Sequence, residues 1–128
     1  MPKWFTPDLL QTLAPGSRYR DVWPSLFVAP AGLRSDLHVD AFGSHFWMAL
    51  FEGRKRWTFF RPEDTPWLQP SFAAGTEPSF PAGAVAAAGD LRPFVVDLMP
   101  GDILFVPAGC PHTVENLEPS LAVRGPGW

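Results

Sequence analysis

The sequence predicts a small, mainly β protein of jelly-roll type. Sixteen prolines and 11 glycines divide the 128 residues into short pieces and leave no long periodic segment for a helix of ordinary length. Short apolar and aromatic runs alternate with Gly and Pro turns, which is the pattern of antiparallel strands. The length predicts a single domain over residues 1–128.

Composition limits the partners and the compartment. With 46% hydrophobic residues, the chain is expected to fold without a disulfide or a structural metal. A net charge of -3 gives no electrostatic reason to expect nucleic acid or an anionic membrane as the main partner. The single cysteine, Cys110, suits a reducing compartment, and the N-terminus lacks the apolar segment of a signal peptide. We therefore expect an intracellular protein, cytoplasmic or nuclear.

A short helix and an edge strand are predicted to precede the candidate site. Thr6 and Pro7 fit the N-cap and the first position of a helix that a Pro-Gly pair ends. Residues 22–29 predict a strand, whose proline places that end at an edge or a bulge. Residues 30–35 are then expected to form a loop.

His38 and Asp40 form the first half of a candidate metal site. Because they lie two apart on a short extended segment, both side chains leave the same face, one with an imidazole and the other with a carboxylate. Alone, the pair is a weak signal, since such spacings often arise by chance on solvated strand edges.

A hairpin with an isolated lysine follows. Residues 45–51 and 55–60 predict two aromatic-rich strands joined by a tight glycine turn. Lys55 shares one face of the second strand with Trp57 and Phe59. If these rings point inward, Lys55 does too.

The C-terminal half supplies the third candidate ligand. Residues 62–92 predict an irregular insertion, with a helix start at Pro62. Further strands are predicted at residues 94–98, 103–106 and 120–124; the second is continuously apolar and is expected to be buried. A sharp turn then delivers His112 to the start of another strand. Two imidazoles and one carboxylate on one face of an iron ion leave three positions open.

Several polar residues have simpler interpretations. His45 is interpreted as a surface or packed histidine, and Cys110 as a small buried residue at a turn. Glu115, Asn116 and Glu118 are interpreted as exposed turn residues.

The motifs from His38 to Trp57 and from Gly101 to Glu118 resemble those of the jumonji-C, or cupin-8-like, oxygenases. The resemblance is closest to the branch that holds the arginine demethylase and lysyl hydroxylase. It implies a double-stranded β-helix in which His38, Asp40 and His112 hold Fe(II), and 2-oxoglutarate chelates the same iron.

The resemblance also implies cosubstrate contacts. Lys55 falls on the position of the lysine that binds the distal carboxylate of 2-oxoglutarate, and Ser35, three positions before the first ligand, falls on a hydroxyl residue that contacts it. Met48 replaces an asparagine of the branch, and Cys110-Pro111 replaces an aromatic residue. Arg124 replaces a small polar residue; it could be a second carboxylate anchor or point to solvent, and we favour solvent because one buried cation already suits one carboxylate.

The function implied is that of a 2-oxoglutarate-dependent dioxygenase that hydroxylates a side chain of a protein or peptide, or demethylates it by hydroxylation. Against family members the chain looks minimal or truncated, and a partner or a second copy in a homodimer would supply the missing edge. The alternative from another class is a non-catalytic cupin-like module that binds metal but not 2-oxoglutarate. A third candidate, a metal-dependent cupin isomerase or dioxygenase without 2-oxoglutarate, is disfavoured by Lys55.

Overall fold

The structure is a computed structural model that describes residues 12–17, 20, 24–73 and 77–127. Thr6 and Pro7, which predict the start of an N-terminal helix, lie outside these residues. Among the described residues, no helix combines the length and the apolar character that a membrane span requires.

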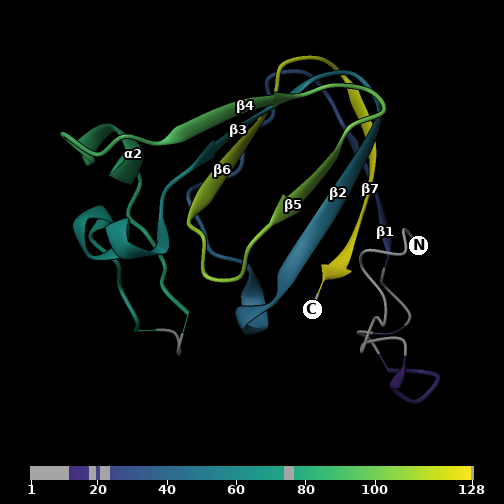
Figure 1. Ribbon diagram of the computed structural model, residues 1–128, viewed down its shortest axis with the longest axis horizontal. Coiled ribbons are helices and arrows are strands. Elements are labelled where there is room, and N and C mark those ends of the chain that lie inside the picture. Colours follow the sequence, from purple (N-terminus) through teal and green to yellow (C-terminus); the bar gives the residue numbers. More distant parts are fainter. Residues whose placement is uncertain (1–11, 18–19, 21–23, 74–76, 128) are drawn as a thin grey trace.

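Within the described residues, seven strands form two antiparallel sheets (Figure 1). The larger sheet has the order β1-β7-β2-β5, with β1 at Ser25–Ala29, β7 at Ser120–Gly127, β2 at His45–Glu52 and β5 at Ile103–Val106. The smaller sheet has the order β4-β3-β6, with β4 at Phe94–Leu98, β3 at Lys55–Phe59 and β6 at His112–Asn116.

An eighth extended segment, residues 32–38, completes the smaller layer, although the sequence predicts a loop over much of it. His38 and His112 exchange two backbone hydrogen bonds of 3.1 and 2.9 Å. Further along, the Ser35 N–H donates to the Val114 carbonyl at 2.9 Å, and the Ser35 hydroxyl accepts the Val114 N–H at 2.9 Å. Two layers of four antiparallel segments make the jelly roll of a cupin, which confirms the predicted fold class.

The core lies between the two layers because alternate side chains of each strand point inward. Its buried members are Phe46, Met48, Leu50, Trp57, Leu98, Val106 and Ala122. A second buried cluster joins the insertion to the jelly roll, with Leu37, Phe60, Leu68 and Ala84 as its members. The insertion therefore contains more regular structure than its composition predicts: a short 3₁₀ helix η4 at Pro62–Leu68, which begins where predicted, and α2 at Ala84–Ala87.

The hairpin turn between β2 and β3 requires its glycine. Gly53 has a φ of 83°, in the left-handed region, and a Cβ atom there would overlap the carbonyl oxygen of Pro119. The turn therefore packs directly on the connection that leads into β7, which fixes the hairpin against the rest of the larger sheet.

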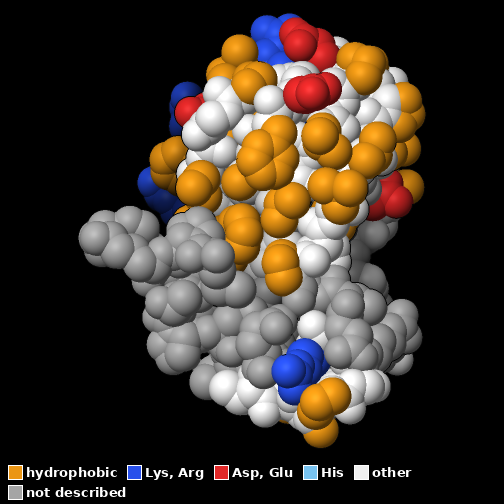
Figure 2. Space-filling view, turned by 90° about the vertical axis from the view of Figure 1, so that its right-hand side faces the viewer, with side chains coloured by type: hydrophobic (Ala, Val, Ile, Leu, Met, Phe, Trp, Pro, Cys, Tyr) orange, Lys and Arg blue, Asp and Glu red, His pale blue; other side chains and the backbone are white. Residues whose placement is uncertain are grey.

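The prediction that the apolar strand at 103–106 is buried is wrong. β5 is the edge of the larger sheet, and Ile103 and Phe105 on its outer face are half exposed. Leu26 and Val28 of β1 pair with Val123 and Leu121 of β7, which places them on the same outer face of the sheet. Both side chains are exposed there. Figure 2 shows hydrophobic side chains gathered on the side of the molecule that carries β1 and β7 in Figure 1. A continuous apolar run thus indicates that both faces of a strand are apolar, but it does not indicate that both faces are buried.

Candidate metal centre

Three candidate ligands come together at one end of the jelly roll. His38 ends the 32–38 segment, Asp40 directly precedes the short 3₁₀ helix η3 at Ala41–Gly43, and His112 begins β6. One potential ligand atom from each of the three lies within 4.8 Å of the other two. His112 Nε2 is 3.7 Å from Asp40 Oδ2. The pairing of the 32–38 segment with β6 therefore joins two sequence-distant motifs into one site.

Each imidazole is oriented by a backbone carbonyl two residues before it. The distance from His38 Nδ1 to the Asp36 oxygen is 2.8 Å, and that from His112 Nδ1 to the Cys110 oxygen is 2.9 Å. A carbonyl can only accept, so each Nδ1 carries the proton and each Nε2 keeps a free lone pair. This is the arrangement that orients histidine ligands in metal sites.

The electrostatics of the site suit a cation. Burial lowers the pKa of His112 to about 4, so this imidazole is neutral at physiological pH, as a ligand must be. Burial raises the pKa of Asp40, while the neighbouring His38 and Arg124 lower it. Asp40 Oδ2 is buried and has no hydrogen-bond partner within the described part of the chain. A buried carboxylate oxygen without a partner is costly, and a divalent ion among the three ligands would satisfy it.

Lys55 points into the space between the sheets, as the hairpin parity predicts. The side chain is only 4% exposed, and its ammonium donates to Oδ1 of Asn116. The same oxygen accepts the Ser120 hydroxyl at 2.9 Å. Burial lowers the pKa of Lys55. Among the described residues, the ammonium meets an amide and no carboxylate, so this buried cation lacks a counter-ion.

Lys55 and the candidate metal ligand His112 share one inner face. In the pairing of β3 with β6, Lys55 lies opposite Asn116 and Phe59 lies opposite His112. The four steps along the strand from Lys55 to Phe59 span about 13 Å. Trp57 lies between them on the same face, with its ring centroid 5.5 Å from that of His112. Its indole N–H is buried and has no hydrogen-bond partner among the residues that the structure describes, so this part of the inner face offers an unused donor.

The prediction that Asn116 is an exposed turn residue is wrong. Asn116 is the last residue of β6 and is 5% exposed. Its Nδ2 donates to the Leu33 carbonyl at 2.9 Å, which fixes the amide so that Oδ1 faces Lys55. The signal that could have found it is parity, since Asn116 and His112 are four apart on one strand and share its inner face.

The preference for a solvent-facing Arg124 is also wrong. Arg124 pairs with Met48 across the β2–β7 ladder, and its guanidinium lies 4.5 Å from the ring centroid of Phe27 and 5.5 Å from that of Phe46. Burial lowers its pKa and Asp40 raises it. The planar, weakly hydrated guanidinium tolerates this position because it can stack on aromatic rings.

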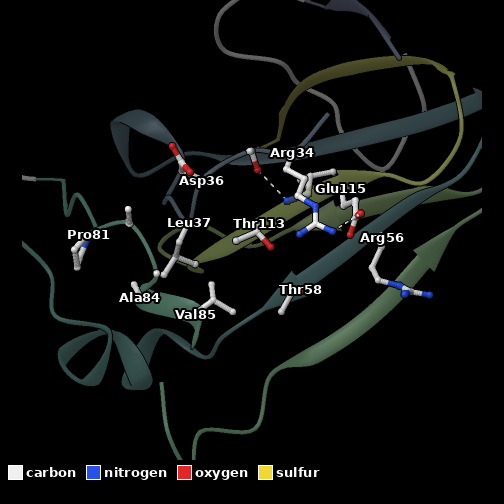
Figure 3. Close-up of a pocket in the computed structure, with 14 residues that line it drawn as sticks. Arg34, Asp36, Leu37, Arg56, Thr58, Pro81, Ala84, Val85, Thr113 and Glu115 are labelled. Atoms are coloured by element: carbon white, nitrogen blue, oxygen red, sulfur yellow. Dashed lines mark hydrogen bonds and ion pairs between the residues drawn. The ribbon is translucent and has the colours of Figure 1, made fainter. Parts of the chain in front are cut away.

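Ser35 is placed differently from Lys55. Among the described residues, its hydrogen bonds join it to the backbone of β6, and it lines a separate cavity of about 370 Å³ on the outer face of the smaller sheet (Figure 3). Thr58 and Thr113 lie on the sheet side of this cavity, and Arg34 forms a 2.6 Å ion pair with Glu115 beside them. The role of Ser35 in cosubstrate binding stays a prediction.

Comparison with known proteins identifies the family. The cupin-like domain model matches residues 9–124. HSPB1-associated protein 1 of Rattus norvegicus is 35% identical over 104 residues, which cover 74% of this chain and 22% of that protein. Arginine-specific demethylase JMJ22 of Arabidopsis thaliana is 29% identical over 133 residues, covering 96% of this chain and 26% of that protein.

The name of a further relative contains both activities of the branch that this chain resembles. The bifunctional arginine demethylase and lysyl-hydroxylase psr-1 of Caenorhabditis elegans is 27% identical over 142 residues, covering 96% of this chain and 33% of that protein. The chain thus spans between about a fifth and a third of the length of these relatives. These similarities confirm the resemblance that the motifs indicate. The chain belongs to the cupin-like domain family.

Proposed function

We propose that this chain carries the metal and cosubstrate site of an Fe(II)- and 2-oxoglutarate-dependent oxygenase that acts on a protein side chain. The observation that supports it is the shared inner face of the His-Asp-His cluster and the buried Lys55, which has no carboxylate partner among the described residues. The cluster provides the ligands for a divalent metal, and the lysine provides a site for an anion.

His38, Asp40 and His112 would hold the iron from one side and leave the other positions open. When bound, iron and 2-oxoglutarate together supply the oxidising chemistry that hydroxylates a C–H bond with dioxygen. The two backbone carbonyls keep the imidazoles in the tautomer that presents Nε2 to the metal. The surrounding rings of Phe46, Trp57 and Phe59, each within 5.8 Å of His112 between centroids, exclude water from that ligand.

Lys55 would bind the distal carboxylate of 2-oxoglutarate. Asn116 holds the ammonium in place through Oδ1 without neutralising it, so the positive charge remains available to a carboxylate. Lys55 and Phe59 lie about 13 Å apart along β3. The lysine side chain and a five-carbon dicarboxylate must fit along this length. The unpartnered indole N–H of Trp57 lies along this path.

Arg124 would compensate for Met48. The branch that the chain resembles carries an asparagine at position 48, and in this chain Met48 belongs to the apolar core. Its cross-strand neighbour Arg124 places a guanidinium in the same part of the interior, close enough to Asp40 to affect its pKa. We propose Arg124 as a second carboxylate contact for the cosubstrate.

The substrate class follows from the relatives. Two of them are named as arginine demethylases, one of which is also named as a lysyl-hydroxylase. Hydroxylation of an N-methyl carbon gives N–CH2OH, whose C–N bond then breaks to release formaldehyde and leave N–H, so both activities begin with the same hydroxylation of a C–H bond. We therefore propose a basic side chain of a protein or peptide as the substrate. A homodimer and an intracellular site of action stay predictions.

Anaerobic titration of Fe(II) and 2-oxoglutarate into the purified protein tests the proposal. Correctly folded protein is expected to develop the metal-to-ligand charge-transfer band that reports bidentate 2-oxoglutarate on iron. Lys55→Met is expected to weaken this band at a given 2-oxoglutarate concentration, whereas Arg56→Met, on the exposed face of the same strand, is expected to retain it. Iron binding without any band would refute the oxygenase and support a metal-binding module, a candidate favoured by the apolar Met48.

A further inference from the structure

The ladder between β2 and β5 ends just before the turn that leads to His112. Its last pair is Phe46 opposite Val106, and the next residue of the chain is Pro107, which has no backbone N–H to donate. The following N–H, that of Ala108, is bound by a side chain instead. His45, the first residue of β2, accepts it on Nδ1 at 2.8 Å.

The turn itself leaves the Ala108 N–H without an internal partner. The Cys110 N–H donates to the Pro107 carbonyl at 3.3 Å, and Gly109 has a φ of 73°, as the third residue of a type II turn requires. In such a turn the N–H of the second residue points away from the turn. His45 therefore supplies an acceptor that the turn lacks.

The imidazole of His45 is held in a defined orientation. Its ring stacks on Phe105, with centroids 5.3 Å apart and planes inclined by 25°. Because Nδ1 accepts a hydrogen bond, it carries no proton. The ring thus acts as a rigid acceptor fixed between β2 and β5.

This hydrogen bond connects the two segments that carry candidate ligands. His45 follows Asp40 by five residues, across η3, and Ala108 precedes His112 by four, within the turn. The other side of the turn is held by Phe60, whose N–H donates to the Pro111 carbonyl at 2.8 Å and whose carbonyl accepts the Cys110 thiol at 3.1 Å. The turn is therefore fixed at both sides.

We propose that His45 is a positioning residue for the metal centre: by holding the Pro107–Cys110 turn against β2, it sets the position of His112 relative to Asp40. The inference rests on the proposed function, because it assumes that these residues bind a metal. It adds a histidine that is not a ligand and that acts through the backbone of Ala108.

Two variants separate the acceptor from the ring. His45→Phe keeps a ring against Phe105 and removes the acceptor, whereas His45→Asn keeps an oxygen acceptor at the branch position of Nδ1. Co(II), a spectroscopic probe for the iron site, is titrated anaerobically into each protein, and thermal unfolding is measured without metal. We expect His45→Phe to bind Co(II) about tenfold more weakly than the wild type, and His45→Asn to bind within about threefold of it.

The outcomes distinguish this inference from the proposed function. If the wild type binds Co(II) and His45→Phe binds it equally well, the inference is overturned while the proposed function stands. Equal weakening in His45→Asn and His45→Phe would overturn it too, because the acceptor would then be irrelevant. A wild type that binds no Co(II) would refute the proposed function and the inference together. Should the variants fail to fold, amide hydrogen exchange of Ala108 in the wild type decides: slow exchange supports the bond, and exchange at the rate of a free amide overturns it.

Discussion

Replacing Lys55 with methionine should weaken the binding of 2-oxoglutarate without a loss of stability. Lys55 is 4% exposed, and the partner of its ammonium is a neutral amide oxygen. Burying an ammonium costs several kcal/mol, of which a hydrogen bond to a neutral group returns about 1.5–3 kcal/mol. Asn116 Oδ1 keeps the Ser120 hydroxyl as a donor, so the substitution leaves no orphaned acceptor. We expect the ligand-free variant to be as stable as the wild type or more stable by about 1–2 kcal/mol.

The same substitution should greatly reduce the affinity for 2-oxoglutarate, although it maintains or increases the stability of the ligand-free protein. A charge-assisted contact between a buried ammonium and a carboxylate contributes about 2–3 kcal/mol, which corresponds to roughly 30- to 150-fold in the dissociation constant. The three proposed metal ligands are untouched, so the affinity for Fe(II) or Co(II) alone should change by less than about threefold.

Urea unfolding of the metal-free protein and calorimetric titration of 2-oxoglutarate into the Co(II)-loaded protein measure the two effects. Arg56→Met is the matched control: Arg56 neighbours Lys55 on β3 but forms an exposed bidentate pair with Asp97, with distances of 2.7 and 2.9 Å. Because this pair is exposed, Arg56→Met should leave the stability almost unchanged and keep its affinity for 2-oxoglutarate. A Lys55→Met protein that is less stable by more than about 2 kcal/mol, or that binds 2-oxoglutarate normally, would show that the ammonium is structural.

Three further predictions concern pH, backbone geometry and thiol reactivity. In metal-free protein the pKa of His112 is about 4, below the ordinary value of 6.5, so its stabilising contribution is complete above pH 6.5 and is lost as the pH falls to 4. The stability lost is about 3 kcal/mol. Urea unfolding at several pH values should show this loss in the wild type and not in His112→Gln; equal pH dependence of the two proteins would contradict the prediction. Gly53→Ala should destabilise by more than about 2 kcal/mol because a Cβ overlaps the Pro119 carbonyl, whereas Gly101→Ala, with a similar φ and open space, should lose only about 1 kcal/mol; equal losses in thermal unfolding would refute the clash. Burial raises the pKa of Cys110, so iodoacetamide should alkylate it slowly in the folded protein and readily in urea, and similar rates would exclude a buried thiol.

Local chemistry explains what could be predicted from the sequence. The prolines and glycines limit the length of every element, and the alternation of side chains on a strand is a property of the strand alone. For this reason the hairpin predicts that Lys55 and Trp57 face the same side, and both are buried in the structure. The two-position spacing of His38 and Asp40, which places both side chains on one face, likewise needed no tertiary information.

What the sequence left open depends on which segments meet. The alternation of side chains that predicts the orientation of Lys55 could not show whether Arg124 faces the core or solvent. That orientation depends on the sheet packed against β7 and on the rings of Phe27 and Phe46, on which the guanidinium stacks. The apolar pattern of β5 could not reveal that the strand lies at an edge, since pairing partners are chosen by the whole sheet.

A β chain divided by prolines and glycines, an inward lysine and two separate candidate ligand motifs can be inferred from the sequence alone. The pairing of residues 32–38 with β6, which brings His38 and Asp40 to His112, is visible only in the folded chain, as are the hydrogen bonds of Asn116 to Lys55 and of His45 to the Ala108 N–H. The physical reason is that backbone hydrogen bonds between distant segments carry no residue code: any non-proline pair can form them, and the packing of the whole jelly roll selects which ones do.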